Sequence, residues 1–263
     1  MMPGVLVLAL LAAEVVAGGQ AAAATGGHGG DQLLPLVPRG AGQAGSCTRN
    51  RRWCVLLDEP DEGGAVRPVV SAGGAVRAAP PPPAEEPSTE ESYAVWPALV
   101  TLRDGGFLAG VQVRTGTSYS GGGGSATELR IFHVSSDGTV AAEPSLSVPL
   151  QGSLMIRACF SERDMQRRRG ACHDEYGFSA RIGLAPGAAA SLPILTYTTE
   201  AWTFPRGVSR SADSTRMPPL RPGDLVRHRD PACSFTRRFR FNAAAAAYRP
   251  DTALPECSDY TVP

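Results

Sequence analysis

The stretch that decides the fold is SLMIRACFSERDMQRRRGACHDEYGFSARI, residues 153–182. Two apolar, strand-like segments enclose a charged loop, and Cys159 and Cys172 lie where each segment meets that loop. The two segments can pair as an antiparallel hairpin with the cysteines facing each other. A disulfide there would close 12 intervening residues and stabilise the fold by about 3 kcal/mol in the chain-entropy treatment.

The register with the cysteines opposite each other brings two further pairs together. It sets Arg157 opposite Asp174 and Met155 opposite Tyr176. Opposite-charge and aromatic cross-strand pairs each contribute about 0.2–1 kcal/mol. The charged pair, the aromatic pair and the disulfide therefore favour the same register.

The rest of the chain has the same strand-like character. Segments rich in Val, Leu, Ile and aromatic residues alternate with Gly- and Asp-rich turns between residues 93 and 242. In the last of them, Phe235, Phe239 and Phe241 share one face, while Arg238 and Arg240 share the other. Helical patterns are few. These features predict an all-β fold, an antiparallel β-sandwich or a barrel-like sheet with little helix.

Composition excludes several chemistries. The chain of 263 residues contains 25 basic residues, and every one is arginine. Without lysine there can be no Walker-type phosphate-binding loop, no Schiff-base lysine and no Ser-x-x-Lys nucleophile. The formal net charge is zero, although arginines concentrate between residues 206 and 249 and acids between 58 and 91.

The N-terminal region predicts export. Residues 1–24 combine a short apolar run with small residues that end in three alanines, as in a secretory signal. The run is too short for a transmembrane span. Residues 25–45, rich in Gly, Ala and Pro, are expected to be a flexible tail. The predicted location is the periplasm or the extracellular space.

Export changes the interpretation of the cysteines. The chain has an even number, and an oxidising compartment favours disulfides over free thiols. No Cys-x-x-Cys spacing is present. The simplest of the possible pairings joins nearest neighbours in sequence: Cys47–Cys54, Cys159–Cys172 and Cys233–Cys257. We expect these bonds within a single β domain, residues 46–263, interrupted by a disordered Pro- and Glu-rich excursion at 71–92.

Arginine clusters are the candidate ligand-binding residues. Arg167, Arg168 and Arg169 fall at the tip of the predicted hairpin, while Arg238 and Arg240 lie on the polar face of the last strand. An arginine-lined surface suits an anionic glycan, a lipid or an envelope protein. The alternative is that these charges are merely solvated. Nucleic acid is not an expected partner of an exported protein.

Candidate catalytic and metal-binding groups are sparse. His173 and Glu175 are two residues apart on a strand, but a zinc site needs a third protein ligand. No Gly-x-Ser-x-Gly motif is present, and Gly116–Ser120 departs from it at the last position. We therefore predict no metal and no cofactor, and assign no catalytic residue.

The sequence as a whole favours a non-catalytic binding or structural role at the bacterial envelope. The alternative is a hydrolase that acts on an envelope polymer. It would use a carboxylate such as Asp174 or Glu175, with arginines to hold an anionic substrate.

Overall fold

The computed structural model describes residues 30–40, 44–58, 65–72, 90–186 and 191–263. The predicted signal, residues 1–24, lies outside this part of the chain. The strands are β1 (Gln32–Pro38), β2 (Ser46–Thr48), β3 (Trp53–Asp58), β4 (Arg67–Ala72), β5 (Glu90–Thr101), β6 (Phe107–Tyr119), β7 (Gly122–Val134), β8 (Leu146–Ile156), β9 (Asp174–Leu184), β10 (Leu195–Phe204), β11 (His228–Arg229), β12 (Thr236–Asn242) and β13 (Ala247–Pro250). The helices are α1 (Glu162–Arg167) and α2 (Ser258–Thr261), with short 3₁₀ turns at Ser214–Arg216, Pro222–Asp224 and Ala243–Ala245.

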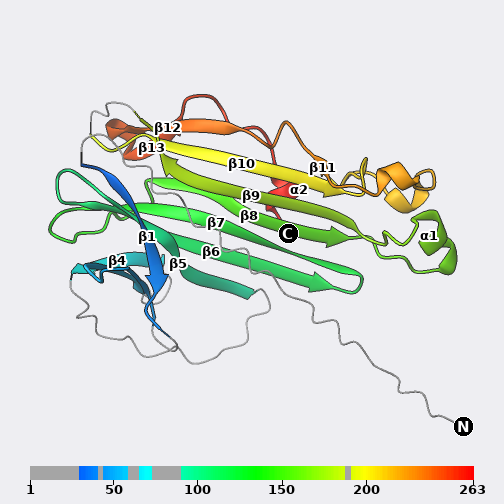
Figure 1. Cartoon of the computed structure of the whole chain (residues 1–263), viewed down its shortest axis with the longest axis horizontal. Helices are drawn as coiled ribbons and strands as arrows, with labels where there is room; N and C mark the ends of the chain where they lie inside the picture. Colours follow the sequence, from blue (N-terminus) through cyan, green and yellow to red (C-terminus); the bar gives the residue numbers. More distant parts are fainter. Residues whose placement is uncertain (1–29, 41–43, 59–64, 73–89, 187–190) are drawn as a thin grey trace, which may run out of the picture.

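The strands form one open antiparallel sheet in the order β13-β12-β10-β9-β8-β7-β6-β5-β1-β2-β3-β4, with β11 paired to β10. The all-β, disulfide-bonded prediction is confirmed, and the sheet does not close into a barrel (Figure 1). From β5 to β10 each strand is hydrogen-bonded to the next in sequence. Short turns join β5 to β6 and β6 to β7, whereas longer segments join the later strands of this meander.

The centre of the sheet is buried on both faces. Successive side chains of a strand point to opposite sides, so Phe107 and Leu108 of β6 enter different apolar clusters. Phe107 packs in a cluster with Val55 of β3, because β2–β4 fold back over this part of the sheet. Leu108 belongs to the larger cluster, which extends across the sheet to Tyr197 and Phe239.

The far end of the sheet curls back over the larger cluster. The Tyr197 hydroxyl of β10 donates to the Pro149 carbonyl at 2.7 Å, and the backbone N–H of Tyr248 donates to the Ser145 carbonyl at 2.7 Å. Tyr260 of α2 packs into the same cluster. The curvature therefore brings Tyr197 of β10 and Tyr248 of β13 against β8 and the residue that precedes it.

The segment predicted as a tail contains a strand. Within 25–45, Gln32–Pro35 pair with β5 and Leu36–Pro38 pair with β2, so β1 connects β5 to β2 within the sheet. The tail prediction is wrong for this segment because Leu36 is buried against Val55, Leu99 and Phe107. Pro35 and Pro38 argue against a strand in the sequence, because proline cannot donate a backbone hydrogen bond to a neighbouring strand.

The Pro- and Glu-rich excursion is shorter than predicted. Residues 71–72 end β4 and residues 90–92 begin β5, so both borders of the 71–92 prediction lie inside strands. The intervening residues 73–89 lie outside the described residues.

The predicted register of the 153–182 hairpin is wrong by one residue. Tyr176 pairs with Leu154 and not with Met155. Because side chains alternate between faces, this shift decides which one is buried. Leu154 is 3% exposed and packs in the large cluster with Tyr176, whereas Met155 is 41% exposed. Burial of the alternate apolar residues of β8 therefore decides the register, and not the predicted Arg157–Asp174 and Met155–Tyr176 pairs.

Candidate functional site

The three disulfides join nearest neighbours in sequence, as predicted: Cys47–Cys54, Cys159–Cys172 and Cys233–Cys257. Cys47 and Cys54 are cross-strand partners in β2 and β3. Cys159 and Cys172 lie beyond the ends of β8 and β9, where their bond closes the loop that carries α1. Such bonds are typical of proteins that fold in an oxidising compartment.

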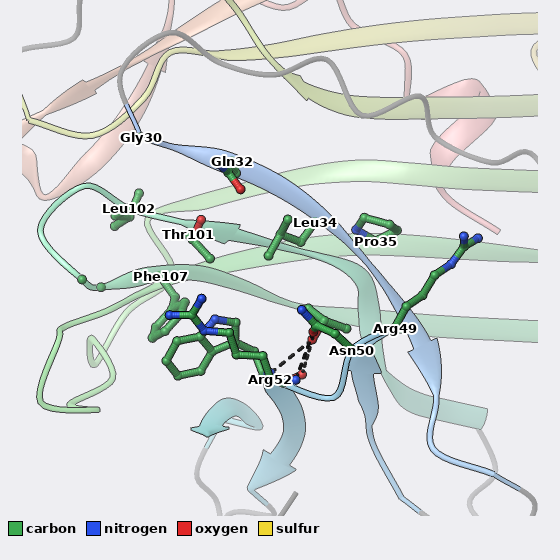
Figure 2. Close-up of a pocket in the computed structure, with 14 residues that line it drawn as sticks. Gly30, Gln32, Leu34, Pro35, Arg49, Asn50, Arg52, Thr101, Leu102 and Phe107 are labelled. Atoms are coloured by element: carbon green, nitrogen blue, oxygen red, sulfur yellow. Dashed lines mark hydrogen bonds between the residues drawn. The ribbon is translucent and has the colours of Figure 1, made fainter. Parts of the chain in front are cut away.

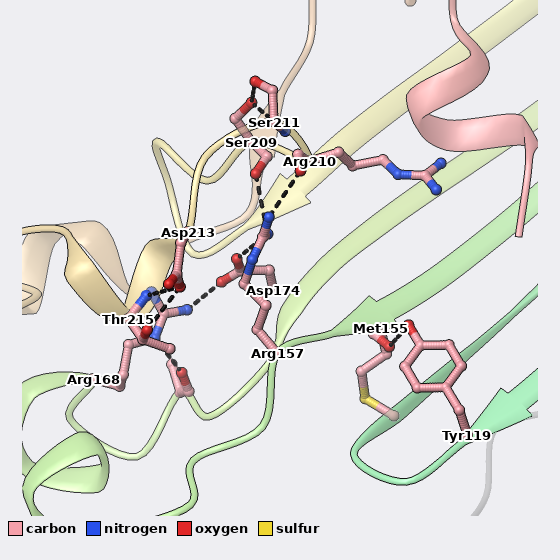
Figure 3. A network of polar contacts seen from close by, with 11 residues as sticks. Tyr119, Met155, Arg157, Arg168, Asp174, Ser209, Arg210, Ser211, Asp213 and Thr215 are labelled. Atoms are coloured by element: carbon pink, nitrogen blue, oxygen red, sulfur yellow. Dashed lines mark hydrogen bonds and ion pairs between the residues drawn. The ribbon is translucent and has the colours of Figure 1, made fainter.

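The base of that loop contains a buried charge cluster. Asp174 has no exposed surface, and its two carboxylate oxygens accept hydrogen bonds from Arg157 and Arg168 (Figure 3). Arg157 also donates to the backbone carbonyls of Ser209 and Arg210 at 3.1 and 2.8 Å. The cluster therefore ties the hairpin to the segment that follows β10.

Two of the three tip arginines contribute to this tie. Arg168 is 6% exposed, because its guanidinium bonds to Asp174 and to the Ala171 carbonyl. Arg167 donates to the Met217 carbonyl at 2.6 Å. Of the three, only Arg169 is exposed with a side chain that makes no hydrogen bond to another described residue. The tip is thus chiefly a structural element, and the ligand-binding prediction for it rests on Arg169.

The buried charge cluster contains Asp174, one of the two carboxylates considered for a hydrolase. Asp174 cannot meet a substrate in this arrangement, since both oxygens are buried beneath guanidinium groups. Glu175 and His173 are half-buried and line a shallow hollow with Arg169 and Phe204. Among the described residues, no three His, Cys, Asp or Glu side chains come together as a metal site would require. The hydrolase alternative stays a prediction.

The arginines of the last strand lie in a different setting. Arg238 and Arg240 of β12 are exposed, and Arg240 pairs directly with Arg249 of β13. Arg238 pairs with Thr196 of β10. On β9, which pairs with the other edge of β10, Arg181 is also exposed. We call Arg181, Arg238, Arg240 and Arg249 the arginine face.

The charges of the arginine face are not neutralised by ion pairs within the described part of the chain. Two exposed acids lie close by: Glu200 on β10, and Asp251, whose backbone N–H donates to the Arg238 carbonyl. Neither is within ion-pair distance of these arginines. The face is therefore a cationic surface with a small acidic border.

The arginine face does not merge with the hairpin tip. Arg238 pairs with Thr196 of β10, and Thr196 in turn pairs with Gly183 of β9. Gly183 lies nine residues along β9 from Asp174. At roughly 3.3 Å per residue this is about 30 Å. The predicted set of five arginines therefore divides into two groups at opposite ends of β9.

A third feature was missed by sequence reasoning. Beside β1 lies a groove of about 520 Å³, lined by Gly30, Gln32, Leu34, Pro35, Thr48, Arg49, Asn50, Arg52, Trp53, Thr101, Leu102, Gly105, Gly106 and Phe107. We call it the β1 groove. Figure 2 shows Arg52 and Asn50 beside the aromatic floor. In the sequence, the local signal at this groove is the run Arg51-Arg52-Trp53, which by itself indicates no more than the start of an apolar strand.

Comparisons with protein-family models, with curated proteins and with solved structures give no match. The helices of the described segments are all too short to cross a membrane. Fold and site together define a disulfide-bonded, open-sheet β protein with a cationic strand face and a separate groove.

Proposed function

We propose that the protein is a non-catalytic binding protein of the bacterial envelope, exported to the periplasm or the cell surface. It holds an anionic component of the envelope on the arginine face. The observation that carries this proposal is the set of four exposed arginines on neighbouring strands, without ion-pair partners among the described residues.

Physical chemistry supports this use of the face. Four guanidinium groups on a rigid sheet attract phosphate, sulfate or carboxylate groups, and guanidinium binds such oxyanions in a bidentate manner. A rigid sheet also limits the conformational cost of arranging these charges. Three disulfides suit a protein that works outside the reducing cytoplasm. The partner is an anionic glycan, a lipid surface or an acidic envelope protein.

The test is binding to anionic probes. The mature protein would be titrated with dextran sulfate and with phosphatidylglycerol-containing vesicles over a range of ionic strength. Replacing Arg238, Arg240 and Arg249 by glutamine should weaken binding by about threefold or more, since exposed charge pairs contribute about 0.2–1 kcal/mol each. Added salt should weaken the wild type as well.

The matched control removes the same charge elsewhere. Arg114, Arg163 and Arg206 are exposed and make no ion pair with a described residue. Their replacement by glutamine should leave binding close to wild type. Equal losses in both triple variants would show only a response to net charge, and the proposal would fail.

A further inference from the structure

The β1 groove combines an aromatic floor with cationic walls. The rings of Trp53 and Phe107 meet edge to face, with centroids 4.7 Å apart. The guanidinium carbon of Arg52 lies over the Trp53 ring at 5.5 Å. Arg49 projects from the turn after β2, as Figure 2 shows. Apolar rings beside charged donors form a surface for a ligand that has both an apolar face and negative charge.

The polar lining of the groove is rich in donors. The Asn50 side-chain oxygen already accepts from the Thr48 hydroxyl at 2.8 Å and from the Arg52 backbone N–H at 3.1 Å. Its amide NH₂ therefore stays available to a ligand. Gln32, Arg49 and Arg52 are exposed, and their side chains make no hydrogen bond to another described residue. The amide groups of Asn50 and Gln32 and the guanidinium groups of Arg49 and Arg52 thus all offer N–H donors at the groove.

None of the described residues that line the groove is acidic. Two carboxylates adjacent in sequence to lining residues are already occupied: Asp31 accepts from the Arg103 backbone N–H and pairs with its guanidinium, and Asp104 accepts from the Gly106 backbone N–H. Arg49 and Arg52 therefore have no ion-pair partner within the described part of the chain. This favours an anion with several oxygen acceptors over a neutral or cationic ligand.

The groove is held in a fixed shape. The Cys47–Cys54 disulfide closes the turn that carries Arg49, Asn50 and Arg52. Within the turn, the Thr48 hydroxyl accepts from the Trp53 backbone N–H at 3.1 Å. On the other side, β1 is paired to β5. A preformed site avoids the entropic cost of ordering its walls when a ligand binds.

We infer that the β1 groove binds an acidic sugar residue of a saccharide. The sugar's carboxylate would meet Arg49 and Arg52, and its hydroxyls would accept from Asn50 and Gln32. The apolar C–H face of the ring would lie on the Trp53–Phe107 pair. The volume of about 520 Å³ is within the range of small-ligand sites. This site is separate from the arginine face and does not depend on the function proposed for it.

The experiment uses isothermal titration of the mature protein with trigalacturonate, with neutral maltotriose as the comparison. We expect the acidic trisaccharide to bind and the neutral one to bind at least about tenfold more weakly, because the arginines recognise the carboxylate. Replacing Arg49 and Arg52 by glutamine should reduce the affinity by about fivefold or more. Gln32→Ala should cause a smaller loss.

A charge-matched control removes two arginines that belong neither to this groove nor to the arginine face. Arg114 and Arg163 replaced by glutamine should leave trigalacturonate binding unchanged. The inference is overturned by the absence of trigalacturonate binding, by equal binding of maltotriose, by unchanged affinity of the Arg49/Arg52 variant, or by an equal loss in the Arg114/Arg163 variant. All five substituted positions are exposed, and thermal unfolding of each variant would verify that the fold is intact.

Discussion

Arg157 and Asp174 form an ion pair of 2.9 Å although they are not partners in the strand ladder. The ladder ends where Ile156 pairs with Asp174. Arg157 then adopts a left-handed backbone conformation, with φ near +60°, which is uncommon for a residue with a side chain. From this position its guanidinium reaches back to the carboxylate and to the carbonyls of Ser209 and Arg210.

Replacing Asp174 by asparagine should destabilise the protein by about 3–5 kcal/mol. The substitution removes the carboxylate that pairs with both Arg157 and Arg168, and a buried charge without its partner is costly. Urea unfolding followed by circular dichroism would measure the loss. Glu143→Gln, which removes an exposed carboxylate, is the control and should cost less than about 0.5 kcal/mol. Equal stabilities of the two variants would contradict the structural role of Asp174.

The ion pair illustrates how much the sequence could predict. Charge and spacing identified Arg157 and Asp174 as partners, because both lie close to the Cys159–Cys172 bond in sequence. The register could not be obtained in this way. It depends on which β8 residues enter the large cluster, and that depends on strands distant in sequence, such as the one that contains Tyr197.

The β1 groove, by contrast, could not be predicted from the sequence at all. Its walls come from residues 30–35, 48–53 and 101–107, and no local pattern links these three segments. The strand-like alternation predicted Phe239 and Phe241 as the apolar side of β12, and Phe239 is indeed buried. Alternation within one strand is a local property. The meeting of β1, the Cys47–Cys54 turn and the β5–β6 turn is a property of the whole fold.

Removing the Cys159–Cys172 disulfide should lower the free energy of unfolding by about 3 kcal/mol, because the open loop regains conformational freedom in the unfolded chain. The double variant Cys159→Ser/Cys172→Ser would be compared with the wild type in urea. Limited trypsin digestion supplies a second measurement, since Arg163 and Arg169 in this loop should be cleaved faster. Unchanged stability and unchanged cleavage would show that the cluster around Asp174 holds the loop without the disulfide.

Gly177→Ala should destabilise the sheet by about 1–3 kcal/mol through overpacking. Gly177 pairs with Trp202 in β10, and a Cβ at this glycine would lie 2.3 Å from the indole ring. Arg227 lies over the same ring at 4.1 Å, which limits its room to move. Thermal unfolding would record the loss.

Gly116→Ala is the matched control for that substitution. Gly116 is also a strand glycine, but its added Cβ would meet only the Gly124 carbonyl, at 3.8 Å. It should be neutral or slightly stabilising. In a Trp202→Ala background the cost of Gly177→Ala should fall, because the clashing ring is gone. A cost that persisted without the indole would show that the ring is not its cause.

Stability should decline as the pH rises from about 10 towards 12. Burial and, to a lesser extent, the negative charge of Asp174 together raise the pKa of Tyr176 from its ordinary value near 10 to about 12. The folded protein therefore keeps this proton at a pH where the unfolded chain has lost it. Its contribution to stability is fully present below pH 10 and is lost above it, with a slope of about 1.4 kcal/mol per pH unit.

Burial raises the pKa of Tyr197, Tyr248 and Tyr260 in the same direction, so the four slopes add. Urea unfolding at about pH 8, 10 and 11, which bracket the ordinary tyrosine pKa, would measure the summed effect of the four tyrosines on stability. Tyr176→Phe keeps the ring but removes one titrating group, so its stability should decline less steeply by about 1.4 kcal/mol per pH unit. Parallel pH profiles of the variant and the wild type would show that Tyr176 ionises equally in the folded and unfolded chains.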